Sequence, residues 1–355
     1  MKKSTPTKTK LAIGLDVGDR FTHLCGLDDM GEVVLEERLP TREPAIRKRF
    51  AKMPRSRIAL EVGRHSPWLS RLLAEHGHEV IVANPRKVRL ITATSTKNDR
   101  LDAEKLARLA RVDPALLYPI RHRREETQGT LAILRSRELA VQVRTKLINS
   151  VRAQVLAVGG KLPAGHIWSF QELVDEVPEV IRDALAPLME LIGGISGQIR
   201  HYDRVIDEIA REVYPETELL EQVWGVGPVT ALAFILTIED KERFARSRDV
   251  GAYLGLCPRQ DQSGQVDKQL GITKAGDSLV RKLLVQCSHR LLSDQGPDTD
   301  LKRWGLHLAA RGGKAAKKRA VVAVARKLAI LLHRLWVTGA VYEPLRNAVG
   351  TESAA

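Results

Sequence analysis

The order of predicted elements between residues 11 and 112 constrains the fold most. Three short β-rich runs, LAIGLDVG, FTHLCGLD and GEVVLEERL, are separated by Gly and Asp turn residues, which predicts a three-strand meander. A helix over 44–52, the strand RIALEVG, the helix SPWLSRLLAEHG, the strand EVIVANP and helices around Val88 and over 101–110 follow. This β-β-β-α-β-α-β-α order predicts a mixed sheet with helices on its faces.

That order is typical of a ribonuclease H-like domain, and it puts two acidic residues in unusual positions. Asp16 lies inside the first strand, where an apolar core residue is expected, and Glu61 lies at the end of the fourth. In the ribonuclease H-like topology these strands are parallel neighbours, so the two carboxylates would lie side by side. Buried like charges repel and lose hydration, a cost that a bound divalent cation offsets.

Two more carboxylates, Asp99 and Asp102, begin the last helix of this region, in KNDRLDAEKLARLA. One interpretation is local: Asp99 is the N-cap and Asp102 completes a capping box, because negative charge is favourable at a helix N-terminus. The other is that the helix start brings both residues to Asp16 and Glu61. Four carboxylates would suit one or two Mg²⁺ ions, which prefer hard oxygen ligands and serve phosphoryl transfer.

From residue 116 to 215 the strand signals vanish. The segment LAILRSRELAVQVRTKLINSVRAQVLAV predicts one long helix, and a second stretch over 188–213 follows a break near Pro178 and Pro187. The predicted apolar stripe is Leu131, Leu139, Val143, Leu147, Val151 and Val155, and the charged face is Arg135, Arg137, Arg144, Lys146 and Arg152. The favoured interpretation is a helical hairpin for spacing or oligomerisation, without chemistry of its own.

The C-terminal region begins with VWGVGPVTALAFIL, a G-x-G turn with Pro228 at the first position of the next helix. This is typical of a helix-hairpin-helix, whose backbone N–H groups suit a phosphate, although the same turn also serves as structural punctuation. The segment LGLCPRQDQSGQVDKQLGITKAGDSLVRKLL predicts an ordered irregular loop leading into helices. The helix RGGKAAKKRAVVAVARKLAILLHRLW has a basic N-terminal half.

The net charge and the cysteines indicate which partners and which kinds of site the protein can have. The chain has 57 Lys and Arg against 43 Asp and Glu, a net charge of +14, which indicates a polyanionic partner, most commonly nucleic acid. Three cysteines without a C-x-x-C predict neither a zinc site nor a disulfide framework and fit a reducing cytoplasm. The apolar stretch AVVAVARKLAILLHRLWV is interrupted by basic residues, so no membrane partner is expected.

Another group of proteins, with a different function, shares the predicted order of strands. The segment GLDVGDRFTHLCGLDDMGEVV also looks like the phosphate-binding hairpin of the sugar kinase, actin and chaperone ATPase group. That group needs a second phosphate loop of D-x-G-x-T type and a glycine-rich adenosine loop. Gly193-Gly194 and Gly312-Gly313 lie in helical, basic surroundings, so the sequence does not favour this group.

Jointly, the motifs resemble those of the DEDD-type insertion-sequence transposases, described as bridge-RNA-guided serine recombinases and related to site-specific DNA invertases. The resemblance covers roughly residues 11–340 and rests on GLDVG, ALEVG, KNDRLDAEKLA, GVGPVTA and the segment from YLGLCPRQ to LVRKLL. It implies that Asp16, Glu61, Asp99 and Asp102 are the catalytic acidic tetrad. The domains expected are a basic tail at 1–10, a RuvC-like domain at 11–115, a helical hairpin or coiled-coil linker at 116–215, a mainly α transposase domain at 216–340 and a tail at 341–355.

The resemblance also implies a nucleophilic serine in the loop after LGLxPRQ. Many family members carry two adjacent serines before the glycine there, whereas this sequence has Gln262-Ser263-Gly264. Ser263 is therefore the expected nucleophile, forming a phosphoserine link to cut DNA, with Ser278 as the alternative. Without the resemblance, a lone Ser in such a loop reads as a turn residue. The serine is expected to meet the acidic site of another protomer.

The implied transposase is cytoplasmic and nucleoid-associated in a prokaryotic cell. Its expected partners are target and donor double-stranded DNA, a structured guide RNA and further copies of itself, from dimer to tetramer. The candidate nucleic-acid contacts are Gly225, Gly227, Arg259, Lys274, Lys314, Lys317 and Lys318. Two other functions stay open: a Holliday-junction-type endonuclease that uses metal-activated water, and an inactive nucleic-acid-binding protein.

Overall fold

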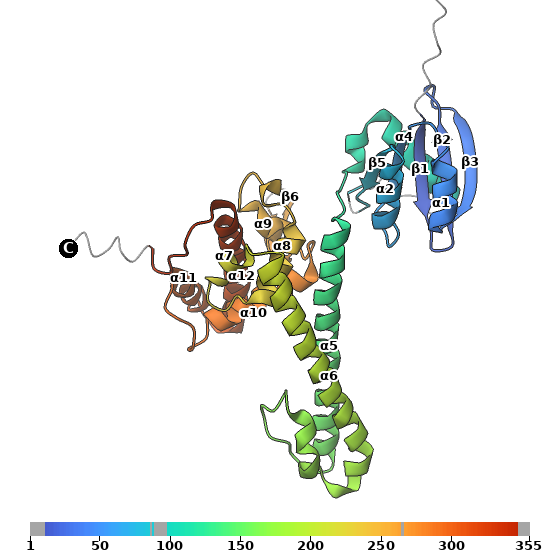
Figure 1. The fold of residues 1–355 in the computed structure, drawn as a ribbon. Helices are drawn as coiled ribbons and strands as arrows, with labels where there is room; N and C mark the ends of the chain where they lie inside the picture. The colour runs from blue at the N-terminus through green and yellow to red at the C-terminus, as the bar shows by residue number, and fades with distance from the viewer. Residues whose placement is uncertain (1–10, 86, 89–97, 264–265, 347–355) are drawn as a thin grey trace, which may run out of the picture. The chain divides into compact units, whose positions relative to one another are not determined.

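The computed structural model describes residues 11–85, 87–88, 98–263 and 266–346, except for the side chains of 260–263, 266–269 and Lys314. The chain divides into two units, Met1–Arg124 and Glu125–Ala355, whose helices and strands Figure 1 labels. Each unit has its own apolar core. Within the described residues, no helix has the length and apolar character that a membrane span requires.

The first unit is built on a five-stranded mixed sheet in the order β3-β2-β1-β4-β5. Its strands are β1 (Ala12–Val17), β2 (Phe21–Leu27), β3 (Val33–Pro40), β4 (Arg57–Glu61) and β5 (Glu79–Ala83). Its helices are α1 (Glu43–Phe50), α2 (Ser66–Glu75), α4 (Asp99–Val112) and the 3-10 turn η1 (Pro114–Leu117). The first three strands pair antiparallel, and β1, β4 and β5 run parallel, so the predicted mixed sheet is confirmed.

Alternate residues of β1 face the two helical layers. Ile13 and Leu15 are fully buried in the core that α1 and α2 share. Gly14 faces α4, where a Cβ would lie 1.9 Å from the carbonyl oxygen of Ala103. The helix therefore packs directly on the strand backbone, and only glycine fits at this position. Asp16 lies on the same face as Gly14, because side chains two residues apart in a strand point the same way.

The second unit is mainly helical. Its helices are α5 (Glu125–Ala157), α6 (Glu179–Glu212), α7 (Thr217–Glu221), α8 (Pro228–Ile238), α9 (Asp249–Tyr253), α10 (Ser278–Leu291), α11 (Asp300–Ala309) and α12 (Gly313–Thr338), with the 3-10 turns η2 (Phe170–Glu176) and η3 (Lys241–Arg243). One two-stranded hairpin is added by β6 (Pro258–Ser263) and β7 (Val266–Ile272). The apolar helix α8 is buried from Thr230 to Ile238 and forms the centre of the core.

The helical hairpin of α5 and α6 differs from its prediction in two respects. Pro187 lies inside α6 and does not break it. Leu185 and Met189, on either side of it, are buried against η2 and α5, and this packing offsets the one backbone hydrogen bond that proline removes. The predicted faces of α5 are also partly wrong, since Leu139 is 61% exposed while Arg144 is buried.

The C-terminal segment expected to be an irregular loop is instead the β6–β7 hairpin. Its strands consist mostly of polar residues, so they lack the apolar alternation by which strands are predicted. The turn before α8 follows the prediction: Gly225 has a φ of +87°, Gly227 is the N-cap, and Pro228 is the first helical residue.

Candidate active site and nucleic-acid interface

The structure brings Asp16 and Glu61 to neighbouring strands. The parallel register of β1 and β4 pairs Gly14 with Ala59 and Leu15 with Leu60, and Asp16 and Glu61 are the next residues of the two strands. Paired residues of parallel strands point to the same face, about 4.8 Å apart. The two acids therefore lie on the face of the sheet that α4 covers. We call this end of the sheet, with the first turn of α4, the acidic edge.

Asp99 and Asp102 occupy the first turn of α4, but neither caps it. Asn98 is the N-cap, and its side chain accepts a hydrogen bond from the backbone N–H of Arg100 at 3.1 Å. The capping-box interpretation is therefore wrong; asparagine serves as an N-cap as well as aspartate does. Since α4 packs on Gly14 through Ala103, its first turn lies toward the Asp16 end of β1.

His23 links the strand and the helix of the acidic edge. It pairs with Asp16 across β1 and β2, and its Nε2 lies 3.9 Å from Oδ2 of Asp99. Sequence reasoning missed this residue, although the strand alternation of FTHLCGL places it on the same face as Cys25 under α4. His23 is suited to position Asp99 relative to Asp16.

The carboxylates of α4 lie beside nitrogen atoms of the protein itself. Oδ1 of Asp102 lies 3.0 Å from Nζ of Lys105, and Oδ2 of Asp99 lies 3.9 Å from Nε2 of His23. Across the described part of the chain, no three His, Cys, Asp or Glu side chains come close enough together to hold a metal ion as they stand. The backbone thus brings the four acidic residues to the same side of the sheet. In this conformation, however, their carboxylate groups do not form a metal site.

Two loops border the acidic edge. Asp19 follows β1, and Arg64 and His65 follow β4; Nε2 of His65 lies 3.5 Å from Oδ1 of Asp19. The Arg64 side chain is 89% exposed, with its guanidinium 3.9 Å from Asp19. An exposed arginine beside carboxylates can neutralise a phosphate that approaches them.

Cys25 is not a candidate nucleophile, because burial, with Glu104 and Glu36, raises the pKa of its thiol to about 11.

Ser263 ends β6 and pairs with Val266 of β7. We call β6 and β7 the serine hairpin. Its base is closed by two glycines: Gly255 has a φ of +70°, and a Cβ on Gly276 would lie 2.1 Å from the carbonyl oxygen of Tyr253. The Thr273 N–H also donates to the Cys257 carbonyl at 2.9 Å. The Gly-rich motif therefore closes the hairpin base, while the Ser263 side chain and Gly264 lie outside the described residues.

Ser278, the alternative nucleophile, is the first residue of α10. Asp277 caps this helix and accepts from the backbone N–H of Leu279 at 2.9 Å. Arg281 donates to the carbonyls of Leu254 and Gly276, at 3.0 and 3.1 Å, and so ties α10 to the hairpin base. Sequence reasoning missed Asp277 and Arg281. Its only signal was an acidic residue directly before an apolar helical pattern.

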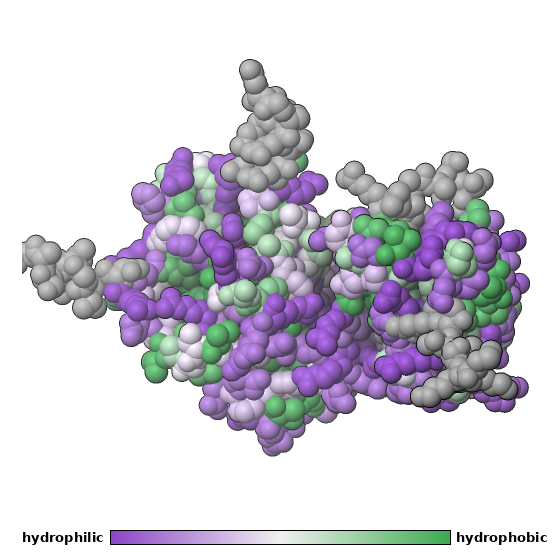
Figure 2. Space-filling view, turned by 90° about the horizontal axis from the view of Figure 1, so that it is seen from above, coloured by the Kyte–Doolittle hydropathy of each residue, from purple (hydrophilic) through white to green (hydrophobic). Residues whose placement is uncertain are grey.

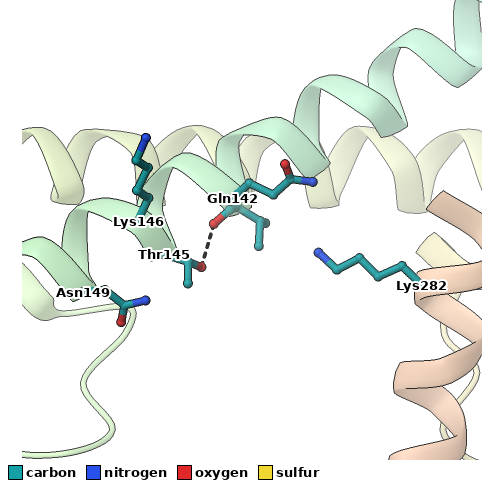
Figure 3. Close-up of a pocket in the computed structure, with 6 residues that line it drawn as sticks. Gln142, Thr145, Lys146, Asn149 and Lys282 are labelled. Atoms are coloured by element: carbon teal, nitrogen blue, oxygen red, sulfur yellow. Dashed lines mark hydrogen bonds between the residues drawn. The ribbon is translucent and has the colours of Figure 1, made fainter. Parts of the chain in front are cut away.

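A groove runs between α5 and α10 (Figure 3). It has a volume of about 370 Å³ and is lined by Val141, Gln142, Thr145, Lys146, Asn149 and Lys282. Lys282 extends from α10 toward α5, and the Thr145 hydroxyl donates to the Val141 carbonyl at 2.8 Å. An adjoining groove shares Gln142 and Lys282 and includes Ser278. The Lys282 ammonium is paired with Glu138 of α5, so Lys146 and the amides of Gln142 and Asn149 are the groups of this groove that suit a sugar-phosphate backbone.

The candidate nucleic-acid contacts fall at separate places in the second unit. Gly225 and Gly227 form the turn before α8, whereas Arg259 and Lys274 are both exposed at the base of the serine hairpin, where β6 begins and β7 has ended. Lys317 and Lys318 are exposed near the start of α12, and the Lys314 side chain lies outside the described residues. Figure 2 shows hydrophilic residues over most of one face of the molecule, with hydrophobic residues in small groups.

Comparison with known sequences decides the family. Residues 13–158 match a transposase family model of DEDD type, and residues 217–300 match the model of the IS116/IS110/IS902 transposase family. Together the two matches span more than half of the chain. The chain belongs to the IS110/IS116 family of transposases. It is therefore an enzyme of the class that cuts and rejoins DNA.

Two relatives resemble the transposase over most of its length. The transposase for insertion sequence element IS1111A of Coxiella burnetii is 27% identical over 345 residues, covering 94% of this chain and 92% of the relative. The transposase for element IS1328 of Yersinia enterocolitica is 29% identical over 281 residues, covering 78% of this chain and 82% of the relative. Transposases of the DEDD family are generally metal-dependent.

Proposed function

We propose that this transposase cuts DNA by the joint action of the acidic edge and Ser263, and rejoins it through a phosphoserine intermediate. The observation that carries the proposal is the placement of Asp16 and Glu61 as the residues that follow the last paired positions of β1 and β4. The strand order β3-β2-β1-β4-β5, with an antiparallel meander and two parallel strands, supports a ribonuclease H-like, RuvC-like fold for this unit.

The donor set at the acidic edge fits Mg²⁺. Asp16, Glu61, Asp99 and Asp102 are the residues that would hold one or two ions, since carboxylate oxygens are the ligands that Mg²⁺ prefers. Bound there, the metal would lower the pKa of an attacking hydroxyl and neutralise charge on the scissile phosphate. His23 holds Asp99 beside the strand of Asp16, and Arg64 is placed to meet the incoming phosphate.

The covalent step conserves one phosphodiester bond. The hydroxyl oxygen of Ser263 attacks the phosphorus and loses its proton, and one P–O bond to a deoxyribose breaks. The released deoxyribose oxygen takes up a proton and leaves as a hydroxyl, so no water and no ATP are consumed. In the reverse step, a hydroxyl from another DNA end attacks the phosphoserine and frees Ser263. Because the acids and the serine belong to different units, the proposed site is composite, completed between protomers of a dimer or tetramer.

The proposed partners are target and donor duplex DNA and a structured guide RNA that selects the sites by base pairing. The net charge of +14 supports partners of this kind, because phosphate contacts position a nucleic acid without reading its sequence. The proposed place of action is the nucleoid of a prokaryotic cell.

A covalent-adduct assay tests this chemistry. The transposase, Mg²⁺, labelled plasmid carrying the element's own flanks and transcribed flanking RNA are incubated, denatured in detergent and examined for DNA attached to protein. We expect an adduct with wild type and with Ser278→Ala, and none with Ser263→Ala. Free cut ends without adduct, equal in all three proteins, would indicate hydrolysis of the Holliday-junction-resolvase type. An adduct lost only in Ser278→Ala would move the nucleophile to α10.

The acidic edge has its own test in the same assay. Asp16→Asn keeps the size of the side chain and removes its charge, so we expect adduct formation to fall about a thousandfold or more. Binding of the same DNA should stay within about twofold, because Asp16 carries no positive charge for a phosphate contact. Full adduct formation by Asp16→Asn, or by wild type in a chelator, would overturn the metal site.

A further inference from the structure

The helical hairpin of α5 and α6 contains a buried guanidinium without a carboxylate partner. Arg144 of α5 is 5% exposed, and its Cζ lies 4.2 Å from the ring centroid of Trp168. Its Nη1 donates to Oγ of Ser196 at 3.4 Å, a long hydrogen bond. Its buried Nε has no hydrogen-bond partner, and no carboxylate of the described residues forms an ion pair with it.

The surroundings of Arg144 carry surplus positive charge. Arg137 is one neighbour, and Arg200 of α6 lies with its Cζ 5.9 Å from the Trp168 centroid. The carboxylate in this group, Asp203, is paired with Arg137, with Nε and Oδ1 2.7 Å apart. Burial and Arg137 lower the pKa of Arg144 from its ordinary value, but a guanidinium stays protonated in proteins. Three guanidinium groups therefore share one carboxylate.

Such a cluster is costly unless an anion completes it. A charge withdrawn from water must be paired, and an apolar side chain would pack on Trp168 without that cost. Trp168 is 45% exposed and Arg200 is exposed, so the cluster opens to solvent on one side. The planar fork of arginine matches phosphate oxygens, and an exposed indole stacks against a nucleotide.

We propose that Arg144, Arg200 and Trp168 form a binding site for a phosphodiester of a nucleic-acid strand. The two guanidinium groups contact the phosphate, and the exposed part of the indole lies against the adjoining sugar or base. The site is remote in sequence from the acidic tetrad and the serine hairpin and takes no part in the proposed cleavage. It gives the helical hairpin a role in holding nucleic acid rather than in spacing alone.

Equilibrium binding measures this site without any cleavage. Labelled single-stranded DNA, single-stranded RNA and duplex DNA of the element's flanks are titrated over a range of salt concentrations. We expect Arg200→Gln and Trp168→Ala each to weaken binding of at least one probe about five- to tenfold. Arg200→Gln should also flatten the salt slope by about 0.7 for a single strand or 0.9 for a duplex. The preferred probe identifies which strand the site holds.

Arg211→Gln is the matched control for charge. Arg211 lies on the same helix, is exposed and pairs with Asp207 at 2.8 Å, so it loses the same charge away from Trp168. We expect its binding to stay within about twofold of wild type. An equal loss in Arg211→Gln and Arg200→Gln would overturn the site in favour of a general charge effect.

Arg144→Met separates a binding role from a packing role. If Arg144 serves an anion, its replacement removes an unpaired buried charge, so the melting temperature should stay or rise while binding falls about tenfold or more. Inorganic phosphate at constant ionic strength should raise the melting temperature of wild type and not of Arg144→Met. A destabilised Arg144→Met protein, together with wild-type binding by Arg200→Gln and Trp168→Ala, would show that the cluster only fixes the Trp168 loop. If Arg144→Met does not fold, the Arg200 and Trp168 variants decide alone.

Discussion

The acidic edge and the serine hairpin hold their key residues in different ways. The acids lie at the ends of paired strands within a five-stranded sheet, and α4 packs on that sheet at Gly14. Ser263 lies in a separate two-stranded sheet whose base is closed by Gly255 and Gly276. The position of the acids is therefore inseparable from the core of the first unit. The hairpin base is anchored to the core of the second unit through the buried Leu254 and Leu256, whereas Ser263 lies at the other end of the hairpin, where it pairs with Val266.

The largest expected effect comes from breaking the contact between α4 and β1 that positions the acidic edge. In Gly14→Ala the new Cβ would overlap the carbonyl oxygen of Ala103 at 1.9 Å, so α4 must leave the sheet, at a cost of about 3 kcal/mol or more. Hydrogen exchange should rise throughout residues 11–112 and stay unchanged over residues 217–340. Gly63→Ala is the control, because a Cβ there meets nothing within 4 Å. Wild-type exchange in Gly14→Ala would mean that α4 does not contact β1.

Disrupting the base of the serine hairpin should affect only the structure around it. In Gly276→Ala the new Cβ would lie 2.1 Å from the Tyr253 carbonyl oxygen, which forces the hairpin base open at a cost of about 2 kcal/mol. We expect exchange to rise over residues 254–277 and the serine adduct to be lost, with the first unit unaffected. Gly271→Ala, within β7 and open to solvent, should behave as wild type. A full adduct yield from Gly276→Ala would show that the hairpin base does not position the serine.

The same contrast explains what the sequence could predict. The first unit follows apolar alternation and turn residues, so its strands and the strand position of Asp16 were predictable. The serine hairpin has polar strands such as PRQDQS, and nothing local distinguishes them from a loop. Asn98, Asp99 and Asp102 all are capping residue types, so only the hydrogen bond identifies the cap. The burial of Arg144 depends on the rotation of α5 against α6, which tertiary packing sets.

Buried histidines should make both units sensitive to acid. His78 in the first unit and His333 in the second are buried, and burial lowers the pKa of each from 6.5. Nε2 of His333 donates to the Lys241 carbonyl at 3.0 Å, and its Nδ1 lies 3.0 Å from the Ser247 hydroxyl oxygen. The unfolded chain takes up protons near pH 6.5 and the native chain only below it. Stability is therefore complete above that pH and is lost as the pH falls toward the native pKa values.

His333→Gln should distinguish the pH dependence of the stability of the second unit from that of the first. Glutamine keeps a donor and an acceptor but does not titrate, so the second unit should lose part of its pH dependence between about pH 7 and pH 5. The first unit, which keeps His78, should retain its own. Hydrogen exchange at several pH values, compared between residues 11–112 and 217–340, measures both at once. Unchanged pH dependence in the second unit would show that the pKa of His333 in the native protein does not lie below that in the unfolded chain.

The smallest expected effect concerns the basic start of α12 in the second unit. Lys317 and Lys318 are exposed in the first turns of α12, and each contact with a duplex phosphate contributes about 0.9 to the slope of log affinity against log salt. Replacing either lysine by Gln should therefore flatten the slope of log affinity against log salt by up to that amount. Arg334→Gln, an exposed cation at the far end of the same helix, is the matched control and should keep the wild-type slope. A slope that neither lysine changes would make this helix face a solvated surface, and Lys146 in the groove between α5 and α10 would then be the next cation of the second unit to test.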